Sequence, residues 1–403
     1  MKKMLIVRDN RYKLNWGCRA TSIALTQCLG ESFDCCADLK NLHDINYRIP
    51  VKGQSDFVGK HHAETISVFM REWETSEDLT RIYRSIKAAD VVVINGEGCQ
   101  IFCDPARRDL AFSYFVIRLC SEWGIPVFFL NSIMSACPHT GLNQETLAQA
   151  KDVLSYCEHV YLRDPCSWRF ATELGLDNVS YMPDALFSWG VRYEELFKNP
   201  MGTMYGDFLA SWPENQTAFA CEKLPDEYIC VSGASFHPFQ KTEHWGRYFR
   251  TLLQAIESKL HIPVVAVMPG GDTFFREISV EMDVMCIPGD GNILLSALVL
   301  AKASAYVSGR YHPSIMASLG GTPCVFLASN SHKTLSVQEV LGYAEMHEHA
   351  IDPLFDSIGA VVEDLENKLS CGDDLRTTIY NAALANGKMV MGLASKVNAF
   401  VST

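Results

Sequence analysis

The sequence lacks the features of a membrane-spanning or exported chain. It contains no window of about 20 apolar residues, the length that a helix needs to cross a bilayer. Its opening segment Met1–Arg8 holds a run of only four apolar residues, whereas a secretion signal needs about 7–15. We therefore expect a soluble cytoplasmic protein with no integral membrane segment.

The sequence is also short of basic residues. It has 35 Lys and Arg against 47 Asp and Glu, which gives a net charge of −12. A surface that follows a nucleic-acid backbone needs clustered Lys and Arg, so we expect no nucleic-acid partner. A small anion needs only two or three local cations and stays a candidate ligand. The acidic balance argues against firm membrane attachment, which leaves peripheral contact with the inner membrane face as the alternative.

Paired metal-binding cysteines are missing as well. Cys99 and Cys103 are spaced C-x3-C, but no second pair completes a zinc site. The 15 cysteines are odd in number, scattered, and placed mostly in apolar stretches. They predict buried reduced thiols of a cytoplasmic protein, with no metal site.

What is present is a regular alternation of strand-like apolar runs and helix-like stretches. This alternation is typical of parallel sheets with crossover helices. The 403 residues exceed what one hydrophobic core usually serves, and the alternation lapses between about Trp189 and Glu227. We predict an α/β protein with two doubly wound, Rossmann-like domains that face a cleft. It would comprise an N-terminal domain over 1–190, a connecting segment over 191–227, a C-terminal domain over 228–374, and a terminal helix over 375–403 that packs back on the N-terminal domain.

The most informative segment is Ser308-Gly-Arg-Tyr-His-Pro-Ser314. An apolar run before it predicts a buried strand, and Ser314–Leu319 predicts a helix with Pro313 in its first position. Arg310 and His312 are thus placed at a helix start, where unpaired N–H groups and the positive end of the helix dipole favour an anion. The segment predicts a site for a phosphate or a carboxylate.

Two further polar segments follow predicted strands. Val91–Ile94 is typical of a buried strand, and Asn95-Gly-Glu-Gly98 predicts a glycine loop after it. After the strand predicted over His159–Leu162, Asp164 suits the N-cap of a helix and Pro165 its first position. Ligands of doubly wound sheets bind at the carboxyl ends of the strands, where all these segments are expected.

Together these motifs resemble those of the polysaccharide pyruvyl transferase family. Val160–Ser167 is similar to the family's v-R-D-x-x-S segment, and Pro183-Asp184 to the P-D that follows it. Ser308–Pro313 is similar to its R-x-H segment, and Ile94–Gly98 to its early glycine-rich loop. Lys333 matches a lysine often found after the last buried strand. The order and spacing match over roughly residues 1–345.

The resemblance implies a two-domain fold like that of the GT-B glycosyltransferases. It also implies phosphoenolpyruvate as the donor, with no further cofactor. The acceptor would be a hydroxyl pair on a sugar of a surface glycan or of its lipid-linked precursor, and the product a pyruvate ketal. The N-terminal domain would be the acceptor side, and the C-terminal domain would hold the donor anion. The oligomeric state stays open, with a homo-oligomer among the options.

Ketal formation from an enol phosphate requires a proton donor, cations for phosphate and carboxylate, and a base. His312 fits the proton donor because histidine titrates near neutral pH, and a hydrogen bond to its own loop is the alternative. Arg310 and Arg163 fit the anionic groups of the donor, and salt bridges are the alternative. Ser314 and Lys333 complete the predicted donor site.

The remaining candidates concern the acceptor. Asp184 and Glu97 are the candidate bases because each follows a predicted strand, and capping or solvation is the alternative for both. Other residues would bind the acceptor or shape a loop around it, with tight turns, capping or packing as their alternatives. They are Asn95, Gly96, Gly98, Trp16, Ser235 and His237.

Two other functions stay open. A GT-B-type glycosyltransferase would use the same cations for the phosphates of a nucleotide-sugar or sugar-phosphate donor. A non-catalytic anion-binding or glycan-binding relative would bind its ligand without releasing phosphate.

Overall fold

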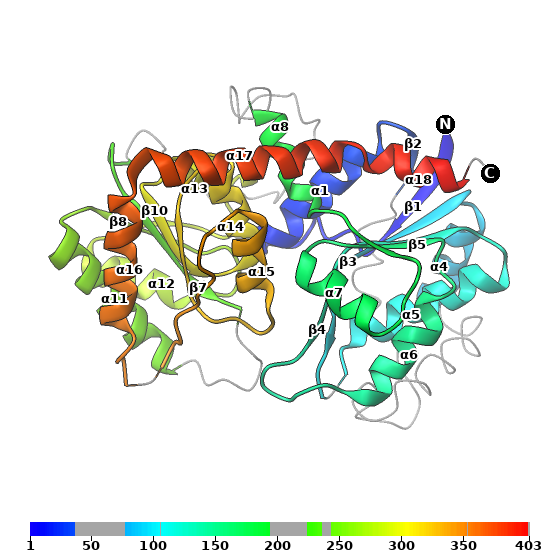
Figure 1. Ribbon diagram of the computed structural model, residues 1–403, viewed down its shortest axis with the longest axis horizontal. Coiled ribbons are helices and arrows are strands. Elements are labelled where there is room, and N and C mark those ends of the chain that lie inside the picture. Colours follow the sequence, from blue (N-terminus) through cyan, green and yellow to red (C-terminus); the bar gives the residue numbers. More distant parts are fainter. Residues whose placement is uncertain (37–76, 105, 194–223, 236–242, 353, 402–403) are drawn as a thin grey trace. The chain divides into compact units, whose positions relative to one another are not determined.

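The computed structural model describes residues 1–36, 77–104, 106–193, 224–235, 243–352 and 354–401 (Figure 1). The chain forms two compact units, each built on one parallel sheet. The first unit comprises Met1–Tyr12, Ser22–Ala185 and Met389–Thr403, and the second comprises Lys13–Thr21 and Leu186–Lys388.

The first unit contains a six-stranded sheet with the strand order β2-β1-β3-β4-β5-β6. Every neighbouring pair is parallel. The strands are rich in Val, Ile and Phe, which suit a pleated surface that is covered on both faces. They are β1 (Lys2–Val7), β2 (Phe33–Cys36), β3 (Val91–Phe102), β4 (Val127–Ala136), β5 (His159–Leu162) and β6 (Val179–Tyr181).

Helices cover both faces of the first sheet, because successive strand residues point to opposite sides. One face, which includes Ile94 and Phe129, packs against α4, α5, α6 and α7. On the other face, the ring of Phe400 in α18 packs against the rings of Phe128 and His159. The helices are α1 (Trp16–Leu29), which begins in the second unit, α4 (Glu77–Lys87), α5 (Arg108–Glu122), α6 (Gln144–Leu154), α7 (Pro165–Glu173) and α18 (Leu393–Val401).

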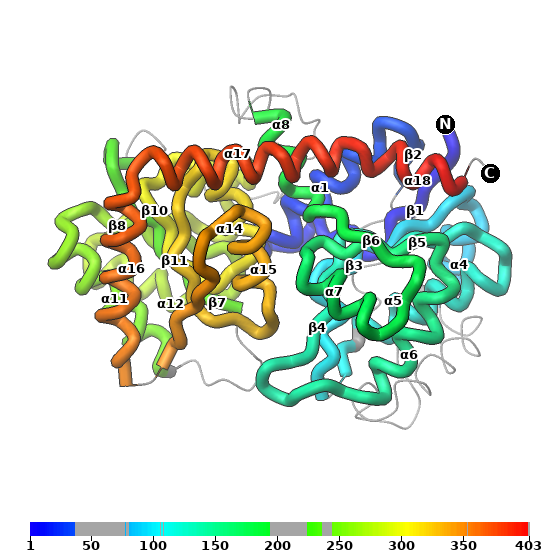
Figure 2. Tube along the Cα trace, viewed as in Figure 1, coloured from blue at the N-terminus to red at the C-terminus, as the bar shows by residue number. Residues whose placement is uncertain are grey.

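The second unit contains a five-stranded parallel sheet with the order β11-β10-β7-β8-β9. Its strands lie in the yellow-green to orange part of the chain trace in Figure 2. One of its faces packs against α11, α12 and α16. Its strands are β7 (Ile229–Ala234), β8 (Val264–Val267), β9 (Met285–Ile287), β10 (Ala305–Gly309) and β11 (Cys324–Phe326). The helices from η1 to α17 are η1 (Ala185–Phe187), α8 (Ser188–Val191), α11 (Glu243–Leu260), α12 (Phe274–Met282), α13 (Ile293–Lys302), α14 (Tyr311–Ser318), α15 (Lys333–Val340), α16 (Ile358–Ser370) and α17 (Gly372–Met391).

Each sheet has one point where the chain reverses the direction in which strands are added. In the first sheet this switch point lies between β1 and β3, and in the second it lies between β7 and β10. Loops at a switch point leave the sheet toward opposite faces, so a crevice forms outside the carboxyl ends of the two strands. The polar residues that follow these four strands are therefore the first candidates for ligand binding.

The structure confirms the predicted α/β class with parallel sheets, and it confirms the start of α7. Asp164 is the N-cap, with its side chain accepting a hydrogen bond from the backbone N–H of Ser167, and Pro165 takes the first position. The predicted strand over His159–Leu162 has the same bounds in the structure. These features could be predicted because the strand, the cap residue and the proline are adjacent in sequence.

Two local predictions were wrong. The residues Asn95–Gly98, predicted as a loop, continue β3, which pairs with β4 as far as Phe102 with a register shift between Glu97 and Gln100. The helix predicted to begin with Pro313 begins at Tyr311 instead, so the proline takes the third position. Proline is tolerated there because the N–H groups of the first turn have no partner within the helix.

The cysteines within the described ranges are free thiols, and most of them are buried. Burial raises the pKa of Cys35 and Cys99 to about 12, which keeps both thiols protonated at neutral pH. No helix in the described part of the chain is long and apolar enough to cross a membrane. Most of the predicted connecting segment, residues 194–223, lies outside the described residues.

Candidate functional site

In the second unit, Arg310 connects β10 to α14 and occupies the N-cap position in an extended conformation (φ −115°, ψ 129°). β10 ends in Gly309, where a Cβ atom would lie 2.9 Å from the carbonyl oxygen of Ala328 and 3.0 Å from the Cα of Ala234. Only glycine fits this approach, so β10 and β7 meet closely just before Arg310. Within the described residues no side chain caps the start of α14. The positive end of this helix thus lies beside a guanidinium group.

The Arg310 side chain is held by Asp272, which follows β8. Its Nε donates to Asp272 Oδ2 at 2.8 Å and its Nη2 to Asp272 Oδ1 at 2.6 Å, and Nη2 also donates to the carbonyl of Gly270. Asp272 is 1% exposed and the arginine side chain 12%. Burial raises the pKa of Asp272 above 3.8, and the guanidinium opposes this shift without cancelling it. These bonds fix the plane of the guanidinium and leave its Nη1 for another partner.

His312 lies in the first turn of α14 against the start of α1. A Cβ atom on Gly17 would lie 2.8 Å from the Cβ and 2.9 Å from the Cγ of His312, so the glycine makes room for the imidazole. The ring of Tyr311 meets the imidazole edge to face, with centroids 5.2 Å apart. Ser314 is buried, and its hydroxyl donates to the carbonyl of Arg310 at 2.8 Å. His312 is 9% exposed, and its imidazole lies against Gly17 on one side and Tyr311 on the other.

Trp16 begins α1 and packs within the second unit. It is fully buried, and its Nε1 donates to the carbonyl of Gly289 at 3.0 Å. Its backbone N–H donates to the carbonyl of Pro269 at 2.7 Å. The structure therefore shows the packing alternative for Trp16, and its ring offers no exposed face for stacking on a sugar.

The other predicted residues of the second unit lie near the strand ends. Ser235 follows β7, and its backbone N–H donates to the carbonyl of Gly309 at 3.3 Å. Lys333 begins α15, is 9% exposed, and donates to Asn330 Oδ1 at 2.8 Å. His237 lies outside the described residues. The structure thus brings Arg310, His312, Ser314 and Ser235 to the carboxyl ends of β7 and β10.

In the first unit, Arg163 follows β5 and pairs with Asp184, which follows β6. Its Nη1 donates to Asp184 Oδ2 at 3.2 Å, and the two side chains are 2% and 0% exposed. The neighbouring Asp164 accepts from both the backbone N–H and the hydroxyl of Ser167 at 2.8 Å. Asp164 is therefore the helix cap, and Arg163 holds the carboxylate of the predicted base Asp184.

Glu97 lies at the centre of a buried amide network formed by residues of β3, β4 and the segment that follows β1. Its Oε1 accepts from the amide of Asn10 and, at 3.2 Å, from that of Asn95. The Asn95 amide also contacts the hydroxyl of Ser22 at 3.0 Å, and its carbonyl accepts from Asn131 Nδ2 at 3.1 Å. Glu97 is 5% exposed and Asn95 0%. The network places the second predicted base at the switch point of the first sheet.

The two predicted glycines serve the packing of β3. A Cβ atom on Gly96 would lie 2.5 Å from the Cβ of Ser132 and would overlap the ring of Phe129, both in β4. The carbonyl of Gly98 accepts from Arg107 Nη1 at 3.0 Å. Gly96 is thus required by the close approach of β4.

Sequence reasoning missed two residues that the structure places at the strand ends, Asp272 and Arg8. Asp272 closes a Pro-Gly-Gly-Asp segment after β8, and Arg8 directly follows β1. The signal was present in both places, since each is a charged residue directly behind a buried strand. Their partners could not be deduced, because Arg310 lies 38 positions from Asp272 and Asp109 lies 101 positions from Arg8.

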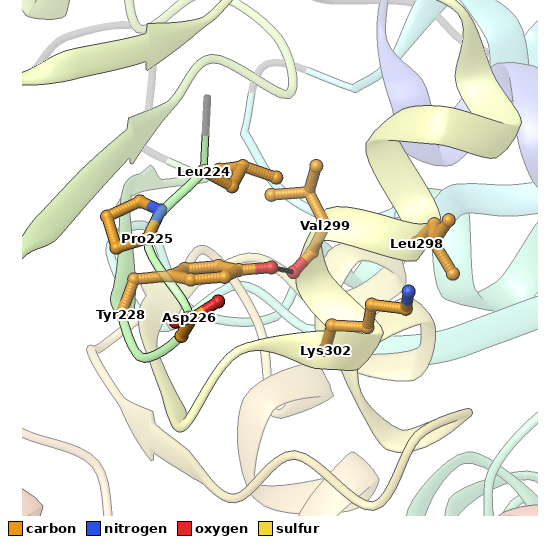
Figure 3. A pocket seen from close by; sticks show the side chains of 7 residues that line it. All are labelled: Leu224, Pro225, Asp226, Tyr228, Leu298, Val299 and Lys302. Atoms are coloured by element: carbon orange, nitrogen blue, oxygen red, sulfur yellow. Dashed lines mark hydrogen bonds between the residues drawn. The ribbon is translucent and has the colours of Figure 1, made fainter. Parts of the chain in front are cut away.

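A pocket of about 370 Å³ lies away from these residues (Figure 3). Tyr228 in its wall directly precedes β7, and its hydroxyl donates to the carbonyl of Val299 in α13 at 2.8 Å. The pocket is thus at the amino end of the strand, opposite the edge that carries Arg310. Its lining has no catalytic constellation and consists of Leu224, Pro225, Asp226, Tyr228, Leu298, Val299 and Lys302. Among the described residues, no group of His, Cys, Asp and Glu is arranged to hold a metal ion.

Solved structures that are similar in fold include UDP-GlcNAc 2-epimerases. The chain is similar to the UDP-GlcNAc 2-epimerase of Methanocaldococcus jannaschii in complex with UDP-GlcNAc and UDP, with 11% identity, 98% of each chain covered and a TM-score of 0.58. It is also similar to the UDP-GlcNAc 2-epimerase of Neisseria meningitidis, with 11% identity, 100% of this chain and 99% of that chain covered, and a TM-score of 0.56. For UGT2 of Phytolacca americana the identity is 10%, all of both chains is covered, and the TM-score is 0.52.

At these identities the likeness concerns the fold, and the predicted GT-B-like architecture is confirmed. A comparison with curated proteins gives no match. The family described as polysaccharide pyruvyl transferase matches residues 27–331, which include the Arg163, Asp184 and Arg310 segments. The chain therefore belongs to the polysaccharide pyruvyl transferase family.

Proposed function

We propose that the protein transfers a pyruvyl group from phosphoenolpyruvate to a hydroxyl pair on a sugar of a polysaccharide or its lipid-linked precursor, forming a pyruvate ketal. The observation that carries the proposal is the presence of both Arg310 and His312 at the start of α14, in a chain of this family. The proposed reaction uses only side chains of the protein and requires no metal or further cofactor.

The donor is proposed to bind at the start of α14. Phosphoenolpyruvate carries a phosphate and a carboxylate, and both suit a planar guanidinium and a helix N-terminus. Asp272 holds the Nε and Nη2 edge of Arg310, so the guanidinium is oriented before the ligand arrives. Ser314 fixes the carbonyl of the same residue. A site ordered in advance loses less entropy on binding.

His312 is the proposed proton donor. In the first step its proton moves to the methylene carbon of phosphoenolpyruvate, and the adjacent carbon becomes an oxocarbenium ion. One sugar hydroxyl adds to that carbon and gives its proton to a base. Phosphate then leaves with the electrons of its C–O bond, and the second hydroxyl closes the ketal ring. The two hydroxyl protons return the histidine to its protonated form and leave with the phosphate, so the reaction balances.

The test measures phosphate release from phosphoenolpyruvate in the presence of a panel of glycan acceptors. We expect His312→Asn to lower the rate by about 100-fold or more while phosphoenolpyruvate still binds, because a positioned acid contributes at least that factor. His244→Asn is the matched control, since His244 is exposed on α11. If the His312 variant released phosphate at the native rate, the proposed acid would be wrong.

A glycosyltransferase remains the second candidate, because two of the similar structures are bound to UDP-sugars. A thermal-shift screen with phosphoenolpyruvate, UDP, CMP and GDP separates the two, since a ligand that binds only the folded protein raises its melting temperature. The pyruvyl transferase predicts a shift with phosphoenolpyruvate. A shift with a nucleotide alone would favour the glycosyltransferase.

A further inference from the structure

Three residues with left-handed backbone lie in or directly after neighbouring strands at the switch point of the first sheet. Arg8 after β1 has φ 62°, Glu97 in β3 has φ 46°, and Asn131 in β4 has φ 56°. β1, β3 and β4 are consecutive neighbours, and β3 pairs with both of the others. Left-handed backbone is unfavourable for Arg and Glu, although Asn adopts it readily, and it persists where the surrounding structure imposes it, often at functional sites. The left-handed backbone of Arg8 and Glu97 therefore makes this edge of the sheet a candidate functional site.

The guanidinium of Arg8 is buried with two of its nitrogens unsatisfied. Its Nη2 donates to Asp109 Oδ2 at 2.9 Å, and the side chain is 6% exposed. Its Nε and Nη1 have no hydrogen-bond partner among the described residues. Burial disfavours the charged form, but Asp109, Cys99 and Glu97 outweigh burial and raise the pKa of Arg8, so it stays charged. Buried donors are almost always paired in folded proteins, so two unpaired ones at a strand end imply an external acceptor.

The groups around Arg8 form a rigid set of donors and acceptors. Asn95 donates to the carbonyl of Arg8 at 3.4 Å and to Glu97 at 3.2 Å. Asn131 accepts from the backbone N–H of Ala185 at 2.9 Å and donates to Asn95 at 3.1 Å. Asn95 and Glu97 lie in β3 and Asn131 lies in β4, so the positions of these three side chains are fixed more firmly than loop residues would be. We call Arg8, Asn10, Asn95, Glu97 and Asn131 the Arg8 site.

The charges near this site suit a neutral polyol better than an anion. Arg8 is countered by Asp109, and Glu97 adds a second carboxylate. A phosphate or carboxylate ligand would face the Glu97 carboxylate at close range. A sugar offers hydroxyl oxygens to the unpaired N–H groups of Arg8 and a hydroxyl proton to Glu97. The mixture of amide, guanidinium and carboxylate groups therefore matches adjacent hydroxyls.

We propose that the Arg8 site binds the hydroxyl pair of the acceptor sugar, with Arg8 donating to the hydroxyl oxygens and Glu97 accepting the proton of the attacking hydroxyl. This inference rests on the proposed pyruvyl transfer and assigns the base that the transfer requires. When the hydroxyl oxygen forms its bond to the donor carbon, its proton moves to Glu97. The second candidate base, Asp184, forms a salt bridge with the cationic Arg163, whereas Asn10 and Asn95, which donate to Glu97, are uncharged.

The binding test uses neutral sugars without the donor. Methyl glycosides of glucose, galactose, mannose and N-acetylmannosamine are titrated up to 100 mM, and saturation-transfer NMR measures their dissociation constants. We expect at least one glycoside to bind the native protein, and Arg8→Met to weaken it by about tenfold or more. Arg118→Met is the matched control, because Arg118 forms an exposed ion pair with Asp152 on the same unit. Arg8→Lys, which keeps the charge beside Asp109, replaces Arg8→Met if that variant does not fold.

The role of Glu97 is tested by Glu97→Gln. The amide oxygen of glutamine can still accept from Asn10 and Asn95, so glycoside binding should change less than twofold. Phosphate release from phosphoenolpyruvate should fall by about 100-fold, because the amide cannot take the hydroxyl proton. Native turnover in Glu97→Gln would contradict its role as base.

Donor binding distinguishes a failure of this site from a failure of the proposed function. Arg8→Met should bind phosphoenolpyruvate like the native protein, whereas Arg310→Met should not. If no glycoside binds the native protein, or if Arg8→Met binds them unchanged, the acceptor site is wrong while the donor chemistry stands. If glycoside binding depends on Arg8 but phosphoenolpyruvate never binds, the site is a glycan site and the pyruvyl transfer is wrong.

Discussion

Because Gly17 lies against His312, we predict that Gly17→Ala lowers the free energy of unfolding, whereas glycine-to-alanine substitutions in helices usually raise it. Replacing a helical glycine by alanine normally stabilises a helix by up to about 1 kcal/mol. Gly17 is the second residue of α1, but a Cβ atom there would lie 2.8 Å from the Cβ of His312 and 2.9 Å from its Cγ. Carbon atoms in contact are normally about 3.5–4.0 Å apart.

Rotation of the imidazole cannot relieve this overlap, because the Cβ of His312 is attached to the backbone of α14. The starts of α1 and α14 must therefore move apart, and overpacking of this kind costs about 1–3 kcal/mol. Subtracting the gain in helix propensity leaves Gly17→Ala up to about 2 kcal/mol less stable than the native protein. The displaced His312 should also lower phosphate release from phosphoenolpyruvate.

Gly246→Ala is the matched control. Gly246 lies in α11 of the same unit, and a Cβ atom there would lie 3.9 Å from the Cβ of Phe274, an ordinary contact. We expect this variant to be unchanged or more stable by up to about 1 kcal/mol. Urea denaturation followed by circular dichroism measures both free energies of unfolding. If Gly17→Ala is as stable as Gly246→Ala, the close approach of Gly17 to His312 is wrong.

Three further predictions follow from other contacts. Asp272→Asn should lower the free energy of unfolding by about 1.5–3 kcal/mol and weaken phosphoenolpyruvate binding, because Arg310 loses its charged partner. Urea denaturation measures the first effect and calorimetry the second. If neither effect were found, the Arg310–Asp272 pair would contribute to neither stability nor binding. Burial alone would raise the pKa of Asp364, but the hydrogen bonds led by that from His349 outweigh it and lower the pKa below 3.8. The stabilisation is therefore present above pH 3.8 and is lost as the pH falls through the lower folded value, so the stability difference between the native protein and Asp364→Asn should shrink on acidification. Finally, Cys371 is exposed, and Cys371→Ser should remove one rapidly reacting thiol in a titration with an aromatic disulfide reagent; an unchanged fast phase would contradict its exposure.

Features decided by neighbouring residues could be predicted from the sequence. The strand over His159–Leu162 is short, apolar and followed by a cap and a proline, and all of these signals lie within one stretch of chain. The strand, the proline and the apolar run around Arg310 are also adjacent in sequence, and they predict a helix start close to this residue. In the structure Pro313 is the third residue of α14. The alternation of such segments was enough to give two parallel sheets.

Features decided by distant residues could not be predicted. The glycines around Glu97 are typical of a loop, but pairing with β4 extends the strand, and Gly96 is needed because Phe129 and Ser132 lie against it. Likewise, Trp16 is predicted to contact the acceptor sugar, but it is buried against the loops after β8 and β9. Composition and periodicity carry no information on which strand or loop lies opposite a given residue.

The most direct test of the account is the binding of phosphoenolpyruvate at Arg310. Isothermal titration calorimetry compares phosphoenolpyruvate and UDP on the native protein, on Arg310→Met, and on Arg250→Met, whose exposed pair with Glu281 makes it the control. We predict that phosphoenolpyruvate binds the native protein and the control alike and binds Arg310→Met at least about tenfold more weakly, a loss of about 1.4 kcal/mol. The account would be contradicted if UDP bound the native protein and phosphoenolpyruvate did not. It would also be contradicted if phosphoenolpyruvate bound all three proteins equally.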